Sequence, residues 1–191
     1  MIRPAKLISG GQTGADLAGL RAGHAMGIPT GGWAPRGWLT ERGAKPFLGT
    51  RYGLQEHRSS RYTARTEQNV IDCSGVVIFG DLKHTGSART IQIARTLGKH
   101  WIANPTAAAL KTWWTDLMAD FAVPDAYGIL NVAGNRESVN PGIEDWVYWI
   151  LLDAWATDRS QVLTAEKNRP NYQPRFHTPP DFKVGYTMES L

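Results

Sequence analysis

The 191-residue chain contains a single cysteine, Cys73, which excludes a disulfide framework and a cysteine-based metal site. His24 and His57 have no partners at metal-ligand spacing, so we expect no metal held by protein side chains. No apolar run approaches the roughly 18–20 residues that a membrane span needs, and no early segment has the form of a signal peptide. We therefore expect a cytoplasmic protein without a membrane partner.

Hydrophobic residues make up 42% of the chain and charged residues 20%, which is typical of an ordinary globular domain. The length suits one domain, and we place a ligand-binding domain at residues 1–160. Residues 161–191 form a different segment, rich in proline with Pro170, Pro174, Pro179 and Pro180. We expect this C-terminal extension to be an extended arm.

A glycine-rich turn stands near the start of the chain, where residues 7–16 read LISGGQTGAD. An apolar run before it and a helix after it predict a strand at Lys6–Gly11 and a helix at Ala15–Met26. Such a turn can present backbone N–H groups and a helix dipole to an anion. It matches neither G-x-G-x-x-G nor a Walker loop, so neither of those nucleotide fingerprints is present.

Strands and helices alternate over the rest of the domain, and the strands are continuously apolar. This pattern indicates an α/β fold with a doubly wound parallel sheet in three layers. The predicted strands are Gly75–Asp81, His100–Ala103 and Gly128–Val132, and the predicted helices are Thr66–Cys73, Ile91–Leu97, about Thr106–Phe121 and Gly142–Asp158. Since ligands bind beyond the carboxyl ends of such strands, we expect the loops at Gly10–Gly14, Thr85–Thr90 and Asn131–Ser138 to converge on one rim.

The net charge of +4 is concentrated in one segment, which argues against a nucleic-acid partner. Residues 36–65 contain seven basic and two acidic residues and show no clear periodicity. A basic patch beside an anion-binding loop suits a compact, multiply anionic ligand. The alternative is a solvated basic loop.

The predicted last helix is apolar nearly all round, since residues 146–155 include Trp146, Trp149 and Trp155. Such a helix is either deeply buried or in contact with a second subunit. We favour the subunit interface, and expect a homo-oligomer, a dimer or a tetramer.

Four ordered segments carry a resemblance to a known family: SGGQTGAD at Ser9–Asp16, GGWAPRG at Gly31–Gly37, RTEQNV at Arg65–Val70 and NVAGNRES-x-x-PG at Asn131–Gly142. Together, over about Leu7–Asp153, the chain resembles the putative molybdenum carrier family. That family belongs to a Rossmann-like superfamily that also includes the lysine-decarboxylase-like phosphoribohydrolases. The resemblance implies a Rossmann-like homo-oligomer that binds the molybdenum cofactor (molybdopterin), an anionic pterin with a phosphate.

The related phosphoribohydrolases use an arginine, then a threonine in a glycine-rich loop and a glutamate three residues later. Arg65 and Thr90 match the first two, but the third position is Ile93. Glu67 or Glu137 could replace the missing carboxylate, although their spacing gives neither a defined role. The resemblance therefore favours binding without catalysis, and we predict no catalytic residue.

The candidate ligand-binding residues come from four places in the chain. They are Gly10, Gly11, Gln12, Thr13, Gly14 and Asp16 in the first loop, Gly32, Trp33 and Arg36 in the second segment, Arg65 and Glu67 in the first turn of a helix, Gly86, Ser87 and Thr90 in a second loop, and Asn131, Gly134, Arg136, Glu137 and Ser138 in a third. Each set has a structural alternative: Thr13, Asp16 and Ser87 are also good helix caps, and the tryptophans could simply hold a loop to the core.

From these residues we expect a protein that binds a phosphate-bearing heterocyclic anion, foremost the molybdenum cofactor, for storage or transfer. The alternative function is a nucleotide-processing enzyme, such as a base–phosphoribose hydrolase, or a sensor of a phosphorylated nucleotide-like signal. In both cases the partner is a small anionic molecule.

Overall fold

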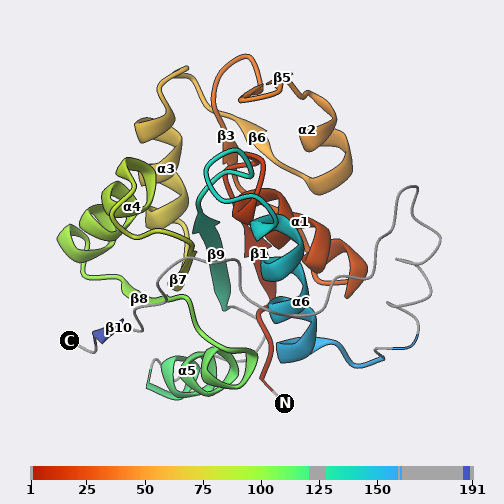
Figure 1. The fold of residues 1–191 in the computed structure, drawn as a ribbon, viewed down its shortest axis with the longest axis vertical. Coiled ribbons are helices and arrows are strands. Elements are labelled where there is room, and N and C mark those ends of the chain that lie inside the picture. Colours follow the sequence, from red (N-terminus) through yellow and green to blue (C-terminus); the bar gives the residue numbers. More distant parts are fainter. Residues whose placement is uncertain (1, 121–127, 159, 161–186, 190–191) are drawn as a thin grey trace.

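A computed structural model describes residues 2–120, 128–158, 160 and 187–189. Its centre is a sheet in the order β10-β8-β7-β9-β1-β2 (Figure 1). Five of these strands are parallel: β1 (Lys6–Ile8), β2 (Thr30–Gly31), β7 (Gly75–Phe79), β8 (His100–Ala103) and β9 (Ile129–Gly134). β10 (Thr187–Glu189) pairs antiparallel with β8 at one edge. The predicted Rossmann-like α/β fold is confirmed.

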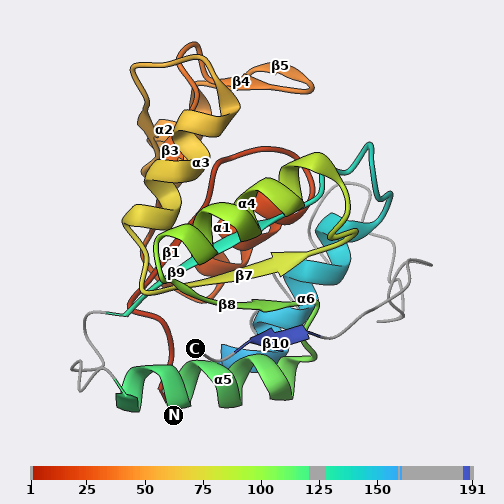
Figure 2. The same ribbon diagram turned by 90° about the vertical axis from the view of Figure 1, so that its left-hand side faces the viewer.

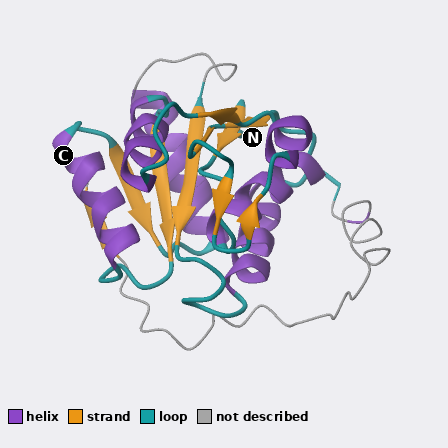
Figure 3. Ribbon diagram, turned by 90° about the horizontal axis from the view of Figure 1, so that it is seen from above, coloured by secondary structure: helices purple, strands orange, loops and turns teal. Residues whose placement is uncertain are grey.

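Helices cover both faces of the sheet, as Figure 3 shows from above. α1 (Ala15–Ala25), α5 (Ala107–Asp120) and α6 (Ile143–Trp155) share one apolar core with Val77 and Val132 of the strands. α3 (Tyr62–Ile71) and α4 (Thr85–Thr96) cover the other face with Val76 and Ile78. Every residue of β7 is buried, because successive side chains of the strand point to opposite faces of the sheet and helices cover both faces.

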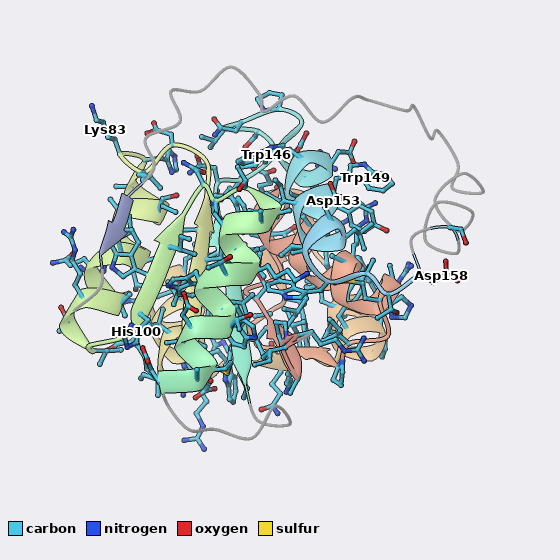
Figure 4. The ribbon with its side chains drawn as sticks, turned by 90° about the horizontal axis from the view of Figure 1, so that it is seen from below. Lys83, His100, Trp146, Trp149, Asp153 and Asp158 are labelled. Carbon is cyan, nitrogen blue, oxygen red and sulfur yellow. The ribbon has the colours of Figure 1, made fainter. Side chains whose placement is uncertain are left out.

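The apolar helix α6 is buried within the chain itself. It packs against α1 and α5, and Tyr148, Leu151 and Trp155 are almost fully buried. Only its outer side, with the partly buried Trp149 and the exposed Asp153, approaches the surface (Figure 4). Packing inside the chain accounts for most apolar side chains of α6, so the apolar helix is not by itself evidence for a subunit interface, and that interface stays a prediction. The homo-oligomer stays a prediction.

The segment between β2 and α3 forms a small lobe beside the sheet. It contains β3 (Trp33–Ala34) paired parallel with β6 (Gln55–Glu56), the β4–β5 hairpin (Leu39–Thr40 and Gly43–Ala44) and α2 (Phe47–Tyr52). Leu48, Tyr52 and Leu54 pack under it against Leu20 of α1. Figure 2 shows the hairpin extending toward the side at which β7 ends.

Two element boundaries differ from prediction in ways that affect the site. α3 begins at Tyr62 rather than Thr66, and α4 begins at Thr85, so Thr85–Thr90 is helix and not a loop. Glu67 is thereby moved out of the first turn of its helix.

Some predictions lie outside the described residues, namely the end of the α5 helix at Phe121 and the arm over 161–186. The division at residue 160 therefore stays a prediction. Within the described ranges, no helix is long and apolar enough to cross a membrane.

Candidate ligand-binding cleft

A cleft of about 350 Å³ lies where the predicted loops meet, beyond the carboxyl end of β9. Its walls come from the loop before α1, one face of α3, the start of α4 and the end of β9. The lining residues are Gln12, Asp16, Tyr62, Arg65, Thr66, Asn69, His84, Thr85, Gly86, Thr90, Asn131, Ala133, Gly134, Asn135 and Arg136. The predicted convergence of three distant segments on one rim is thus present in the structure.

A buried ion pair holds two of the cleft walls together. Arg65 of α3 lies across Gly10, where an added Cβ would stand 1.4 Å from its Nη1 atom. The same Nη1 is 3.2 Å from Oδ2 of Asp16, and the two side chains are 12% and 5% exposed. Burial raises the pKa of Asp16 above its usual value, although the charge of Arg65 opposes that shift.

Part of the hydrogen-bonding capacity around this pair is unused. Nε of Arg65 is buried and has no acceptor within the described part of the chain. The side chain of Asn131, 2% exposed, lines the same cleft. At the mouth of the cleft the Arg136 guanidinium lies over the Tyr62 ring, 5.0 Å from its centroid. A buried cationic donor without an acceptor is costly, and an anionic ligand can contact the 12% of the Arg65 side chain that stays exposed at the cleft.

Two amides of the predicted backbone cradle at Gly10–Gly14 donate hydrogen bonds within the protein. The Gln12 N–H donates to Asp16 Oδ2 (3.2 Å), and the Thr13 N–H donates to Oε1 of Gln12 (3.4 Å). The Thr13 hydroxyl, expected to contact a ligand, donates to Glu41 instead. The amides of Gln12 and Thr13 were predicted to face a phosphate, and that prediction is wrong for the conformation described.

The glycines of this loop allow close packing of the protein on itself. At Gly14, whose φ is +77°, an added Cβ would stand 2.4 Å from the carbonyl oxygen of Asn135. At Gly11, φ +73°, it would stand 2.8 Å from a methyl group of Leu54 in the lobe. The glycines of this loop therefore mark places where chain segments meet, and among Gly10, Gly11 and Gly14 only Gly10 makes room for a cationic side chain.

The start of α4 faces the cleft through His84, Thr85, Gly86 and Thr90. His84 is the N-cap, and its Nδ1 accepts from the Gly86 N–H at 3.4 Å. Ser87 does not line the cleft: it is 1% exposed, and its hydroxyl accepts from Nδ2 of Asn135 at 2.8 Å. Its role is to fix the helix against the end of β9.

Polar residues after β9 have divided roles. Asn131, Gly134 and Arg136 line the cleft. Glu137 caps α6, since its carboxylate accepts from the N–H groups of Gly142 (2.5 Å) and Glu144 (3.0 Å). The Ser138 hydroxyl donates to Glu41. Although burial acts to raise the pKa of Glu41, the hydroxyls of Ser138 and Thr13 and the charge of Arg136 hold it below its usual value.

Comparison with known proteins shows the family of the chain. Residues 7–155 match the circularly permutated YpsA SLOG family. The chain belongs to this family. It is also similar to a solved structure named "putative molybdenum carrier protein" from Syntrophus aciditrophicus, with 35% identity and a TM-score of 0.66 over 79% of this chain and 94% of that one. A search of curated proteins finds no match. The resemblance noted from the sequence is confirmed.

For this member of the YpsA SLOG family, the matched range contains the whole cleft, but not every residue carried over by resemblance reaches it. Trp33 is held outside, because its Nε1 donates to Asp72 at 2.7 Å and its backbone bonds to Asn69. Arg36 and Glu67 are exposed and do not line the cleft. Gly32 permits close packing, since an added Cβ would stand 2.2 Å from the Ser9 carbonyl oxygen.

The structure adds cleft residues that sequence reasoning missed: Tyr62, Thr66, Asn69, His84, Thr85, Ala133 and Asn135. Tyr62, Thr66 and Asn69 share one face of α3 with Arg65, at spacings of three and four residues. That spacing is visible in the sequence once the helix is begun at Tyr62. Of the seven basic residues in 36–65, Arg65 alone lines the cleft described, so most of the basic segment matches the solvated alternative.

Proposed function

We propose that the cleft binds a phosphate-bearing heterocyclic anion and that the protein stores or carries it. The observation that carries this proposal is the Arg65 guanidinium, buried across Gly10 with its Nε lacking an acceptor, beside Asn131 and Asp16. Arg65 and Arg136 supply two cations to the cleft, and a guanidinium binds phosphate in a bidentate manner.

The remaining lining suits a polar heterocycle. Asn131 can hydrogen-bond to ring nitrogens and carbonyl groups, because an amide both donates and accepts. Gln12 can only donate from its NH2 group, since its Oε1 already accepts from the N–H groups of Thr13 and Glu41. Tyr62 offers an aromatic ring at the cleft mouth, 36% exposed, on which a flat heterocycle can stack. A small cationic cleft with amides and one aromatic ring fits a phosphorylated pterin or purine.

Among such ligands we place the molybdenum cofactor first. The similar solved structure is named a molybdenum carrier, and that name supports the assignment. The anionic pterin phosphate would meet Arg65, and the amides would meet the pterin edge. Bound there, the cofactor would be stored or carried and would take part in no reaction.

The enzymatic alternative, a nucleotide-processing hydrolase, has less support from the cleft. Glu137 is engaged in capping α6, and Glu67 is exposed outside the cleft. Ile93 of α4 packs against the core. Asp16 is the one carboxylate among the described lining residues, and it is paired with Arg65. A carboxylate that acts as general acid or base would have to be Asp16, which needs release from that pair; His84 is the other lining side chain of a type that transfers protons.

The test is protection of added molybdenum cofactor from oxidation, measured by loss of its capacity to activate a cofactor-free molybdoenzyme. Wild-type protein should slow that loss at stoichiometric concentration. Arg65→Met should bind about 10–100-fold more weakly, since a charge-assisted contact contributes about 1.5–3 kcal/mol. Arg36→Met is the matched control, because this arginine is exposed outside the cleft.

Failure of the wild type to protect the cofactor removes that assignment. Equal protection by wild type and Arg65→Met, with Arg136→Met also unchanged, removes the cleft as the site. Incubation with nucleoside monophosphates, followed by chromatography for free base, tests the enzymatic alternative. Base release that is lost in Asp16→Asn would establish it.

A further inference from the structure

The tip of the β4–β5 hairpin is attached to the mouth of the cleft through one carboxylate. Glu41 accepts hydrogen bonds from the hydroxyls of Thr13 and Ser138, one on each carboxylate oxygen. Its own N–H donates to Oε1 of Gln12 at 2.9 Å. Arg136, which lines the cleft, adds an attractive charge. Residues far apart in the sequence thus surround a single negatively charged group.

This arrangement is the kind that binds an oxyanion. Two hydroxyl donors and a guanidinium on one side of a carboxylate are the same groups that a phosphate would require. Gln12 and Arg136 belong to the cleft, so the Thr13–Ser138 pair is directly next to it. Glu41 therefore stands where an anionic group of a ligand in the cleft could reach the same donors.

Apart from these contacts, the hairpin packs only weakly against the rest of the protein. No residue from Arg36 to Pro46 is buried, and Leu39 is 40% exposed. Trp38, which packs against Gly49, lies at its base rather than at its tip. An element with few buried apolar contacts opens at low free-energy cost, so loss of the Glu41 contacts can release the tip.

We propose that Thr13, Ser138 and Arg136 form a second oxyanion subsite, that the Glu41 carboxylate occupies it in the absence of ligand, and that the hairpin opens when a ligand anion displaces Glu41. The proposal rests on the proposed function for the position of the ligand. It extends that function to a ligand class: a molecule with two anionic groups, one at Arg65 and one at this subsite.

The test is calorimetric titration with inorganic pyrophosphate. Glu41→Gln, which keeps the shape but removes the competing charge, should bind pyrophosphate about threefold to tenfold more tightly than wild type. Ser138→Ala should bind more weakly, and Glu41→Gln should bring less gain in a Ser138→Ala background, because the subsite has lost a donor. Glu67→Gln, which makes the same change at an exposed carboxylate outside the cleft, is the matched control.

Amide hydrogen exchange over residues 39–44 supplies a readout of opening. Exchange should speed up on addition of pyrophosphate to wild type, and should already be fast in free Glu41→Gln. Weaker or unchanged pyrophosphate binding by Glu41→Gln overturns the subsite, as does slower exchange on binding, which would make the hairpin a closing lid. If Arg65→Met weakens binding while Glu41→Gln changes nothing, the subsite falls and the cleft stands. If Glu41→Gln binds more tightly while Arg65→Met binds as wild type does, the subsite stands and Arg65 is not the ligand contact.

Discussion

Substitution of Gly10 by alanine tests the buried pair at the floor of the cleft without removing either charge. An added Cβ would stand 1.4 Å from Nη1 and 2.1 Å from Cζ of Arg65. The φ angle of Gly10 is not among the positive ones, so alanine strains no backbone there. The flexible arginine therefore has to leave, and Asp16 stays buried without its cation.

The expected cost follows from the burial of the pair. Removing one partner of a buried pair typically costs about 3–5 kcal/mol. Asp16 keeps the Gln12 N–H and can take up a proton, and alanine restricts the unfolded chain by about 0.4–1 kcal/mol. We expect a net loss of about 2–3 kcal/mol at pH 8. For a chain of this size that lowers Tm by about 4–12 °C.

The difference in stability between wild type and Gly10→Ala should depend on pH in a definite direction. Burial already raises the pKa of Asp16 in the native protein, and loss of Arg65 raises it further. At low pH Asp16 is protonated in both proteins and the difference in stability is small. As the pH rises, the variant must bury an unpaired charge or retain a proton at increasing cost, so the difference grows.

Urea unfolding of both proteins at pH 5 and pH 8 measures this directly. Gly86→Ala is the control, because an added Cβ there would be no closer than 3.8 Å to any neighbour, and alanine favours a helix by about 0.5–1 kcal/mol. A Gly10→Ala protein as stable as wild type at pH 8, or equally destabilised at both pH values, would refute the reasoning.

Two further predictions concern the core. Gly19→Ala should destabilise by about 1–3 kcal/mol, because its Cβ would stand 2.6 Å from Cβ and 2.9 Å from Cγ1 of Val132. Denaturant unfolding should show that Val132→Ala, which removes both Cγ atoms but keeps Cβ, partly rescues it, and simple additivity would contradict this. Cys73 should resist alkylation in the native state at pH 8, since burial raises its pKa to about 12. Its labelling rate should follow unfolding, and rapid labelling without denaturant would count against that burial.

The sheet was predictable from sequence because the apolar pattern of each strand lies within a few consecutive residues. The run from Val76 to Phe79 is apolar without interruption, which requires cover on both faces, and β7 has that cover. The same logic located β8 and α1 within a few residues. Four ordered motifs then identified the family, which a single glycine turn does not.

The predictions that were wrong concern contacts between residues far apart in the sequence. The small polar residues at the start of α4 resemble a loop, yet Ser87 is fixed by Asn135, the residue after β9, and that contact supports the helix. Composition cannot reveal that Gln12 and Thr13 use their amides within the protein, or that Glu41 takes the Thr13 hydroxyl. Likewise, an apolar helix has the same sequence whether its partner is α5 or a second subunit.

The pairing of β10 with β8 constrains how copies of this protein can associate. An open strand edge is a template on which another chain can extend a sheet, but Thr187–Glu189 already occupy the free edge of β8. At the opposite edge β2 offers only Thr30 and Gly31. Another molecule can therefore pair with β8 only after β10 detaches, and the outer edges that remain for a continuous sheet are the three residues of β10 and the two of β2.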